Sequence, residues 1–133
     1  MKRAISSDRA PKALGPYSQA VAFGVLLFCA GQIPIDPDTG EISGGDVAAQ
    51  TDLVIENIKA VLAVNAMTLA DVVKTTVFLT RMDDFAVMNE VYARHFTVPF
   101  PARSTVAVAG LPRSAKVEIE VTAAKVAGKG SKA

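Results

Sequence analysis

The sequence has little of what most catalytic centres are built from. Its 133 residues contain one cysteine, one histidine and no tryptophan. A single cysteine cannot form a disulfide within the chain or build a zinc site from several thiolates. A single histidine, His95, excludes a pair of histidines sharing the acid and base roles within one chain. We therefore expect neither a metal centre nor histidine-pair catalysis.

Excess charge and long apolar runs are also missing. The 14 Lys and Arg side chains almost balance the 13 Asp and Glu side chains, which leaves a net charge of +1. Proteins that bind nucleic acid through phosphate contacts usually carry a strongly basic face, so nucleic acid is an unexpected partner. The most apolar stretch, residues 20–31, is shorter than the roughly 20 residues that span a bilayer. With no secretory signal at its start, the chain is expected to be cytoplasmic, without a membrane partner.

Apolar residues make up 50% of the chain, which is enough to bury a substantial core. The length suits one domain over residues 1–133 and leaves little room for a second. We expect an ordered core over about residues 5–125. The small, basic residues 127–133 are expected to form a flexible tail.

The first half of the sequence predicts a hairpin followed by a helix. Residues 18–23 and 26–30 have strand composition and are joined by a tight turn at Gly24. A short edge strand is expected at residues 41–42. Asp46 is a candidate N-cap for a helix over residues 47–65. The apolar side chains of that segment recur at helical spacing: Val47, Val54, Ile58, Val61 and Leu62.

The second half predicts a strand, a helix and two closing strands. Residues 71–80 alternate, which places Val73 with Thr75, Val77 and Leu79 on one face. Asp83 or Asp84 would cap a second helix, which the prolines within residues 98–101 would end. The apolar stripe of this helix consists of Phe85, Met88, Tyr92 and Phe96. Strands at 104–109 and 115–125 are expected to pair with each other across the turn at 110–114. The order indicates an α+β fold with two helices on one face of a mixed sheet.

The other face of that sheet would carry Val72, Thr76 and Phe78. Such side chains are too apolar to stay wet over a wide area, and exposed patches of this kind usually mark an interface. The pattern therefore predicts a homo-oligomer without fixing the number of subunits.

Most residues that could carry chemistry have a simpler structural interpretation. Gly44 and Gly45 precede a helix but lack the lysine and the spacing of a phosphate-binding loop. Cys29 lies in an apolar strand and is expected to be a small core residue. His95, inside the second helix, is expected to be structural. No serine lies in a nucleophile-elbow motif.

Arg103 and Glu118 remain as a pair with two possible interpretations. A guanidinium can bind a carboxylate in a planar, bidentate way, and a nearby glutamate can position a water molecule and move its protons. The same two side chains could instead form a structural salt bridge at a sheet edge. Glu120 lies on the same strand face as Glu118, so spacing alone does not choose between the two glutamates.

Several motifs, in order, resemble the RidA/YjgF/UK114 family of reactive intermediate deaminases, also called the endoribonuclease L-PSP family. Residues 101–106 (PARSTV) and 117–120 (VEIE) resemble its C-terminal signature. Further matches are GPYSQA at 15–20, GQIP at 31–34, VKTTVFL at 73–79, and Asp84-Phe85 with Asn89 and Tyr92. The resemblance extends over residues 5–125.

This resemblance implies a chorismate-mutase-like fold and a homotrimer with clefts between its subunits. It implies hydrolysis of 2-aminoacrylate and related 2-imino acids to 2-keto acids and ammonia, the activity of a 2-iminobutanoate/2-iminopropanoate deaminase. No metal or organic cofactor would take part. Two alternatives are a regulatory trimer that binds small carboxylates without turnover, and an endoribonuclease, a label given to some relatives.

The resemblance also assigns roles by motif. Arg103 would bind the substrate carboxylate and Glu118 would orient the attacking water. The substrate cleft would further be lined by Tyr17, Gly31, Asn89 and Thr105. Two positions depart from many deaminating members: Ala30 stands in place of a serine and Thr105 in place of a cysteine. These changes bear on substrate range and rate.

Overall fold

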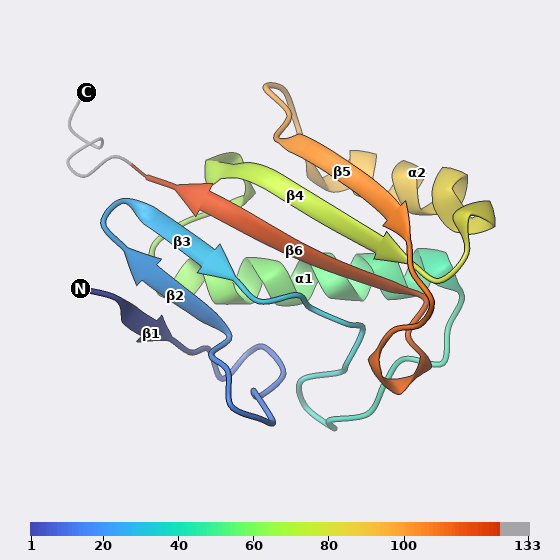
Figure 1. The fold of residues 1–133 in the computed structure, drawn as a ribbon, viewed down its shortest axis with the longest axis horizontal. Coiled ribbons are helices and arrows are strands. Elements are labelled where there is room, and N and C mark those ends of the chain that lie inside the picture. Colours follow the sequence, from blue (N-terminus) through green and yellow to red (C-terminus); the bar gives the residue numbers. More distant parts are fainter. Residues whose placement is uncertain (126–133) are drawn as a thin grey trace.

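The computed structural model describes residues 1–125 and has two layers, a six-stranded sheet and two helices behind it (Figure 1). The strand order is β1-β2-β3-β6-β4-β5, with β4 and β5 parallel and the other pairs antiparallel. This confirms the predicted α+β class. None of the helices in this part of the chain is both long and apolar enough to cross a membrane. The predicted tail at 127–133 lies outside the described residues.

The strands are β1 (Arg3–Ile5), β2 (Ala20–Phe23), β3 (Leu26–Cys29), β4 (Val72–Leu79), β5 (Ala102–Ala107) and β6 (Val117–Ala124). The helices are α1 (Val47–Val64) and α2 (Phe85–His95). Short 3-10 turns lie at Leu69–Asp71, Met82–Asp84 and Pro112–Ser114.

The predicted hairpin and first helix are confirmed. Gly24 joins β2 to β3 with a φ of +61°, a conformation that glycine adopts without steric cost. The Asp46 carboxylate caps α1 by accepting a hydrogen bond from the Ala49 amide at 2.9 Å. The edge strand predicted at residues 41–42 is corrected, because these residues form only a single bridge, between Ile35 and Ile42. β1 was not predicted from the sequence.

The second helix begins differently from the prediction. Asp84 occupies the N-cap position, but its side chain makes no capping hydrogen bond, and Asp83 pairs with Arg81 at 2.7 Å instead. The 3-10 turn at Met82–Asp84 leads directly into α2 and provides the first turn. The apolar stripe is as predicted. Met88, Tyr92 and Phe96 are buried, and Phe85 is partly buried and packs against the core.

The predicted pairing of the two closing strands is wrong. β4 lies between β5 and β6 and pairs with both, parallel to β5 and antiparallel to β6. The cause is α2, which acts as the crossover of a β4-α2-β5 unit and places β5 on the outer side of β4. β6 then fills the gap between β4 and β3.

The alternation of β4 is also broken near its start. The register shifts between Val72 and Lys74, as it does at a β-bulge, where two residues on one strand oppose one on its neighbour. Val72 is therefore buried in the core, and Val73 is 49% exposed. The prediction that Val73 joins Thr75 on the buried face, with Val72 opposite, is corrected.

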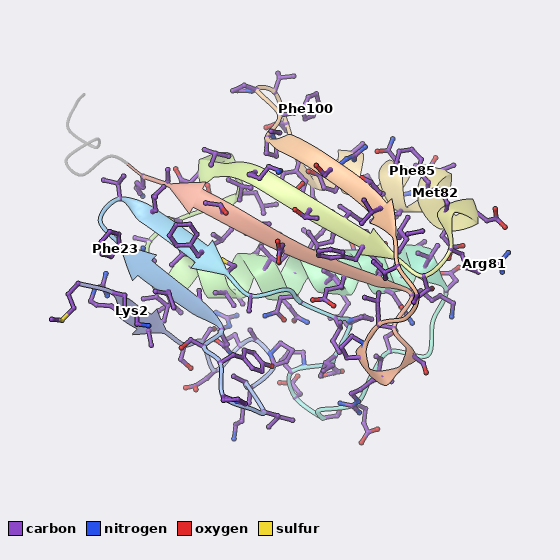
Figure 2. All side chains as sticks on the ribbon, in the orientation of Figure 1. Lys2, Phe23, Arg81, Met82, Phe85 and Phe100 are labelled. Carbon is purple, nitrogen blue, oxygen red and sulfur yellow. The ribbon has the colours of Figure 1, made fainter. Side chains whose placement is uncertain are left out.

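The sheet face turned away from the helices carries apolar side chains, as predicted. Figure 2 looks onto this face and labels Phe23 at the end of β2. Phe23, Phe28 and Val106 are 41–55% exposed and alternate with buried or inward neighbours. We call this surface the open face. Exposed apolar side chains on one face of a sheet favour coverage by a partner.

Candidate functional site

Arg103 lies near the start of β5 and points toward α2. It is opposite Thr75 of β4, whose hydroxyl is hydrogen-bonded to the Tyr92 hydroxyl of α2 at 2.8 Å. Because residues opposite each other in a sheet share a face, Arg103 also faces the helix. Its Nη1 donates to Asn89 Oδ1 at 2.7 Å, and its guanidinium carbon lies 4.8 Å from the ring centre of Tyr92. The amide and the ring hold the guanidinium in one orientation.

The positive charge of Arg103 has no carboxylate partner within residues 1–125, whose ion pairs all involve other side chains. The salt-bridge interpretation with Glu118 is therefore wrong. A pocket of about 420 Å³ lies beside Arg103. Its lining consists of Asn89, Tyr92, Ala93, Phe100, Pro101 and Arg103. A lone guanidinium at the edge of a mostly apolar pocket is suited to a small carboxylate.

Thr105 follows Arg103 by two residues and lies on the same face of β5, opposite Val77. Its Oγ1 is buried and has no hydrogen-bond partner among the described residues. Buried hydroxyls are nearly always hydrogen-bonded in native proteins. Thr105 therefore offers an unsatisfied group close to the guanidinium. We call Arg103, Asn89 and Thr105 the arginine half-site.

Glu118 lies on β6 and faces the opposite side of the sheet. Its neighbours Val117 and Ile119 are fully buried under the helices, so Glu118 points to the open face, opposite Phe78 of β4. It is half-buried, whereas Glu120 is exposed. Burial, and secondly the negative charge of Glu120, raise the pKa of the Glu118 carboxyl above its ordinary value. A proton-carrying role suits Glu118 better than Glu120.

Gly31 is in direct contact with the Glu118 side chain. A bridge between Gln32 and Ile119 brings the two segments together, with an amide-to-carbonyl distance of 2.9 Å. A Cβ at Gly31 would overlap Glu118 Oε2 and lie 2.8 Å from Glu118 Cδ. The glycine is needed here for space, a reason that the sequence alone did not contain.

Tyr17 belongs to the segment beside Gly31. The Ala30 amide donates to the Gln19 carbonyl at 2.9 Å, which ties residues 17–19 to the end of β3. The Tyr17 side chain is 55% exposed. We call Tyr17, Gly31 and Glu118 the glutamate half-site.

The two half-sites are separate within one copy of the chain. Arg103 and Glu118 point to opposite faces of the sheet, and β4 lies between their strands. One copy therefore brings Arg103 together with Asn89 and Thr105, and Glu118 together with Gly31, but it does not bring the guanidinium to the carboxylate. A site with both groups needs a second copy of the chain.

The two residues expected to be structural behave so. Cys29 is 8% exposed, and burial raises the pKa of its thiol to about 12, which leaves little reactive thiolate. His95 Nε2 lies 2.8 Å from Asp52 Oδ1 and joins α2 to α1. His95, Asp52 and Glu56 form a group outside both half-sites, and their possible metal-ligand atoms lie within 4.8 Å of one another.

Comparison with known proteins identifies the family. The family model described as Endoribonuclease L-PSP matches residues 7–125. The chain belongs to this family. That confirms the resemblance on which the site residues were assigned. Among relatives of the L-PSP family, Protein DfrA of Myxococcus xanthus is 55% identical over 124 residues, covering 92% of this chain and 95% of that protein.

A further relative, TdcF of Escherichia coli, matches both in sequence and in structure. The K12 protein named "Putative reactive intermediate deaminase TdcF" is 45% identical over 130 residues, 96% of this chain and all of that protein. The crystal structure of E. coli TdcF with bound serine superimposes with a TM-score of 0.88 at 44% identity, covering 93% of this chain and 99% of that one.

The motifs did not include two residues that line the pocket beside Arg103, Ala93 and Phe100. Phe100 is 61% exposed and Figure 2 labels it just before β5, while Ala93 lies on α2. In the sequence, Phe100 stands between two prolines, and these prolines indicate only the end of a helix. The sequence signal for this pocket residue was an aromatic side chain three residues before the candidate arginine.

Proposed function

We propose that the chain hydrolyses reactive 2-imino and enamine acids, such as 2-aminoacrylate, to 2-keto acids and ammonia in the cytoplasm. The observation that carries this proposal is the Arg103 guanidinium, oriented by Asn89 at 2.7 Å and without an anionic partner in residues 1–125. Such a group binds the carboxylate common to all these substrates. The relative named as a reactive intermediate deaminase, TdcF, supports the same reaction.

The proposed active unit is a homotrimer with three clefts between subunits. Arg103 and Glu118 face opposite sides of the sheet, so a complete cleft pairs the arginine half-site of one copy with the glutamate half-site of the next. A contact between two different surfaces of one protein is heterologous, and it closes into a ring under rotational symmetry. The apolar open face would be covered in that assembly.

The chemistry needs orientation and proton transfer. Arg103 and Asn89 hold the carboxylate and so place the electrophilic imine carbon. Glu118 accepts a proton from water as the new C–O bond forms at that carbon. That proton then passes from Glu118 to the nitrogen. As the C–N bond breaks and ammonia leaves, the new hydroxyl gives its proton to Glu118, its O–H electron pair forms the C=O bond, and the 2-keto acid remains. A protonated imine is already electrophilic, so the proposal includes no metal or cofactor.

A coupled assay tests this function directly. Serine or threonine dehydratase releases the imine, and we expect the wild-type protein to speed the appearance of keto acid and ammonia above the spontaneous rate. No acceleration would contradict the proposal. Saturable keto-acid binding without acceleration would instead favour the regulatory trimer, to which the missing hydroxyl at Ala30 points.

The raised pKa of Glu118 predicts a distinctive pH profile. Glu118 must be ionised to accept a proton from water, and a raised pKa means that acidification removes the ionised form at a higher pH than for an ordinary glutamate. The acid limb of kcat/KM should therefore lie above the usual glutamate range. Glu120→Gln removes the nearby like charge, lowers the pKa of Glu118 and should move this limb to lower pH.

Ionisation of the substrate also shapes the pH profile, but it is the same for every variant. A difference between the acid limbs of two variants therefore reports on the protein alone. Glu56→Gln is the matched control, because Glu56 is an exposed glutamate on α1 that pairs with Lys59 at 3.1 Å. Its acid limb should coincide with that of the wild type. A limb that stays fixed or moves to higher pH in Glu120→Gln would contradict the assignment of Glu118.

The close contact at Gly31 predicts a loss of activity without a loss of fold. In Gly31→Ala the new methyl group occupies the place of Glu118 Oε2, so the carboxylate must move. The far end of a glutamate side chain can move at little cost, and we expect at least a tenfold lower kcat/KM with a thermal midpoint close to that of the wild type. Gly44→Ala is the control, because nothing lies within 4 Å of its added methyl group. Equal activity of both variants would contradict the prediction.

A further inference from the structure

We propose that the pocket beside Arg103 selects imino acids with a bulky apolar side chain, such as those derived from leucine or phenylalanine, over the smallest imino acids. This inference rests on the proposed function, because it concerns the substrate range of the same site. The pocket walls that carry it are Tyr92, Ala93, Phe100 and Pro101.

The polar groups of the pocket are gathered at one end. Arg103 Nη1 donates to Asn89 Oδ1, and the Asn89 amide nitrogen makes no hydrogen bond to any residue from 1 to 125. The remaining guanidinium N–H groups and this amide can therefore both donate to a carboxylate. This end fixes where the acid group of a substrate lies.

The rest of the pocket lining is apolar. The Tyr92 hydroxyl is hydrogen-bonded to Thr75 Oγ1 at 2.8 Å, so this polar atom of the lining already has a partner inside the protein. Ala93 adds a methyl group, and Pro101 and Phe100 add apolar rings. Phe100 is 61% exposed in one copy of the chain, so its ring is accessible to a ligand in this pocket. A substrate side chain would cover it.

The size of the pocket agrees with this assignment. It measures about 420 Å³, within the range of roughly 300–1,000 Å³ that holds ligands much larger than a three-carbon imino acid. A substrate without a side chain would leave the apolar end unfilled. Filling such a pocket with one or more carbon atoms changes kcat/KM by roughly 10–200-fold.

The test compares imino acids produced in place by an L-amino-acid oxidase from leucine, phenylalanine and alanine. Semicarbazide traps the imine, and the protein's activity is measured as the loss of semicarbazone at several protein concentrations. We expect kcat/KM for the leucine- and phenylalanine-derived imines to exceed that for the alanine-derived imine by at least tenfold.

Two variants of α2 link the preference to the pocket. Ala93→Phe fills the apolar end and should reduce the ratio of leucine to alanine activity at least tenfold, and Ala93→Leu should reduce it less. Ala86→Phe makes the same change two turns earlier on α2, outside the lining, and should keep the wild-type ratio. If Ala93→Phe fails to assemble by size-exclusion chromatography, Ala93→Leu decides the matter.

The outcomes separate this inference from the proposed function. An alanine-derived imine hydrolysed as fast as the larger ones would overturn the inference and leave the deaminase function standing. Ratios unchanged in the Ala93 variants, or equally reduced in Ala86→Phe, would also overturn it. If no imine is hydrolysed by the wild type, the proposed function itself fails.

Discussion

Replacing Arg103 by alanine is expected to lower kcat/KM for imino-acid hydrolysis by roughly 10²–10⁴-fold. The guanidinium supplies two charge-assisted hydrogen bonds to the substrate carboxylate, each of about 1.5–3 kcal/mol. Alanine removes both and also leaves Asn89 Oδ1 without its donor. Arg103→Lys keeps the charge but loses the planar pair of N–H groups, so it should recover only part of the activity.

The measurement is the coupled dehydratase assay, with the oligomeric state of each variant checked by size-exclusion chromatography. Arg81→Ala is the matched control, because Arg81 is exposed before α2, pairs with Asp83 at 2.7 Å and lies outside both half-sites (Figure 2). Its activity should equal that of the wild type. Activity of Arg103→Ala within threefold of the wild type, in an intact oligomer, would remove the arginine from the mechanism.

Local patterns predicted the elements better than their arrangement. The helical spacing of apolar residues and the Asp46 cap were sufficient for α1, and the turn at Gly24 was sufficient for the hairpin. These features depend on residues close together in the chain. The bulge near Val72 depends instead on how β4 fits β6, so strict alternation placed Val72 and Val73 on the wrong faces.

The candidate site shows the same division. Family motifs named the residues of both half-sites, but they could not say which face of the sheet each one occupies. That depends on β4 lying between β5 and β6, whereas the sequence favoured direct pairing of the last two strands. Spacing alone left Glu118 and Glu120 equivalent, and the family resemblance chose Glu118. The structure adds a physical reason for that choice, since only Glu118 is half-buried against Gly31.

The opposite orientations of Arg103 and Glu118 predict that two inactive variants restore each other. Arg103→Ala and Glu118→Gln should each be nearly inactive alone. Mixed in equal amounts during assembly, they place an intact Arg103 from one copy beside an intact Glu118 from another at about a quarter of the clefts, if copies combine at random around the ring. This quarter counts trimers of one variant alone, which have no intact cleft; each trimer that contains both variants has one intact cleft out of three. We therefore expect purified mixed trimers to rise from background to about a third of the wild-type value per site.

The experiment uses co-expression with two different affinity tags and purification of the mixed trimers through both. The control is the double variant, which has both changes in one chain. It is co-expressed with the same two tags, purified in the same way and should stay inactive. A site built within a single copy would gain nothing from mixing, because every such site would lack one of the two groups. Recovery therefore distinguishes a cleft between subunits from a site within one chain. Since Arg103 and Glu118 face away from each other across β4, only the shared cleft agrees with both carrying out one reaction.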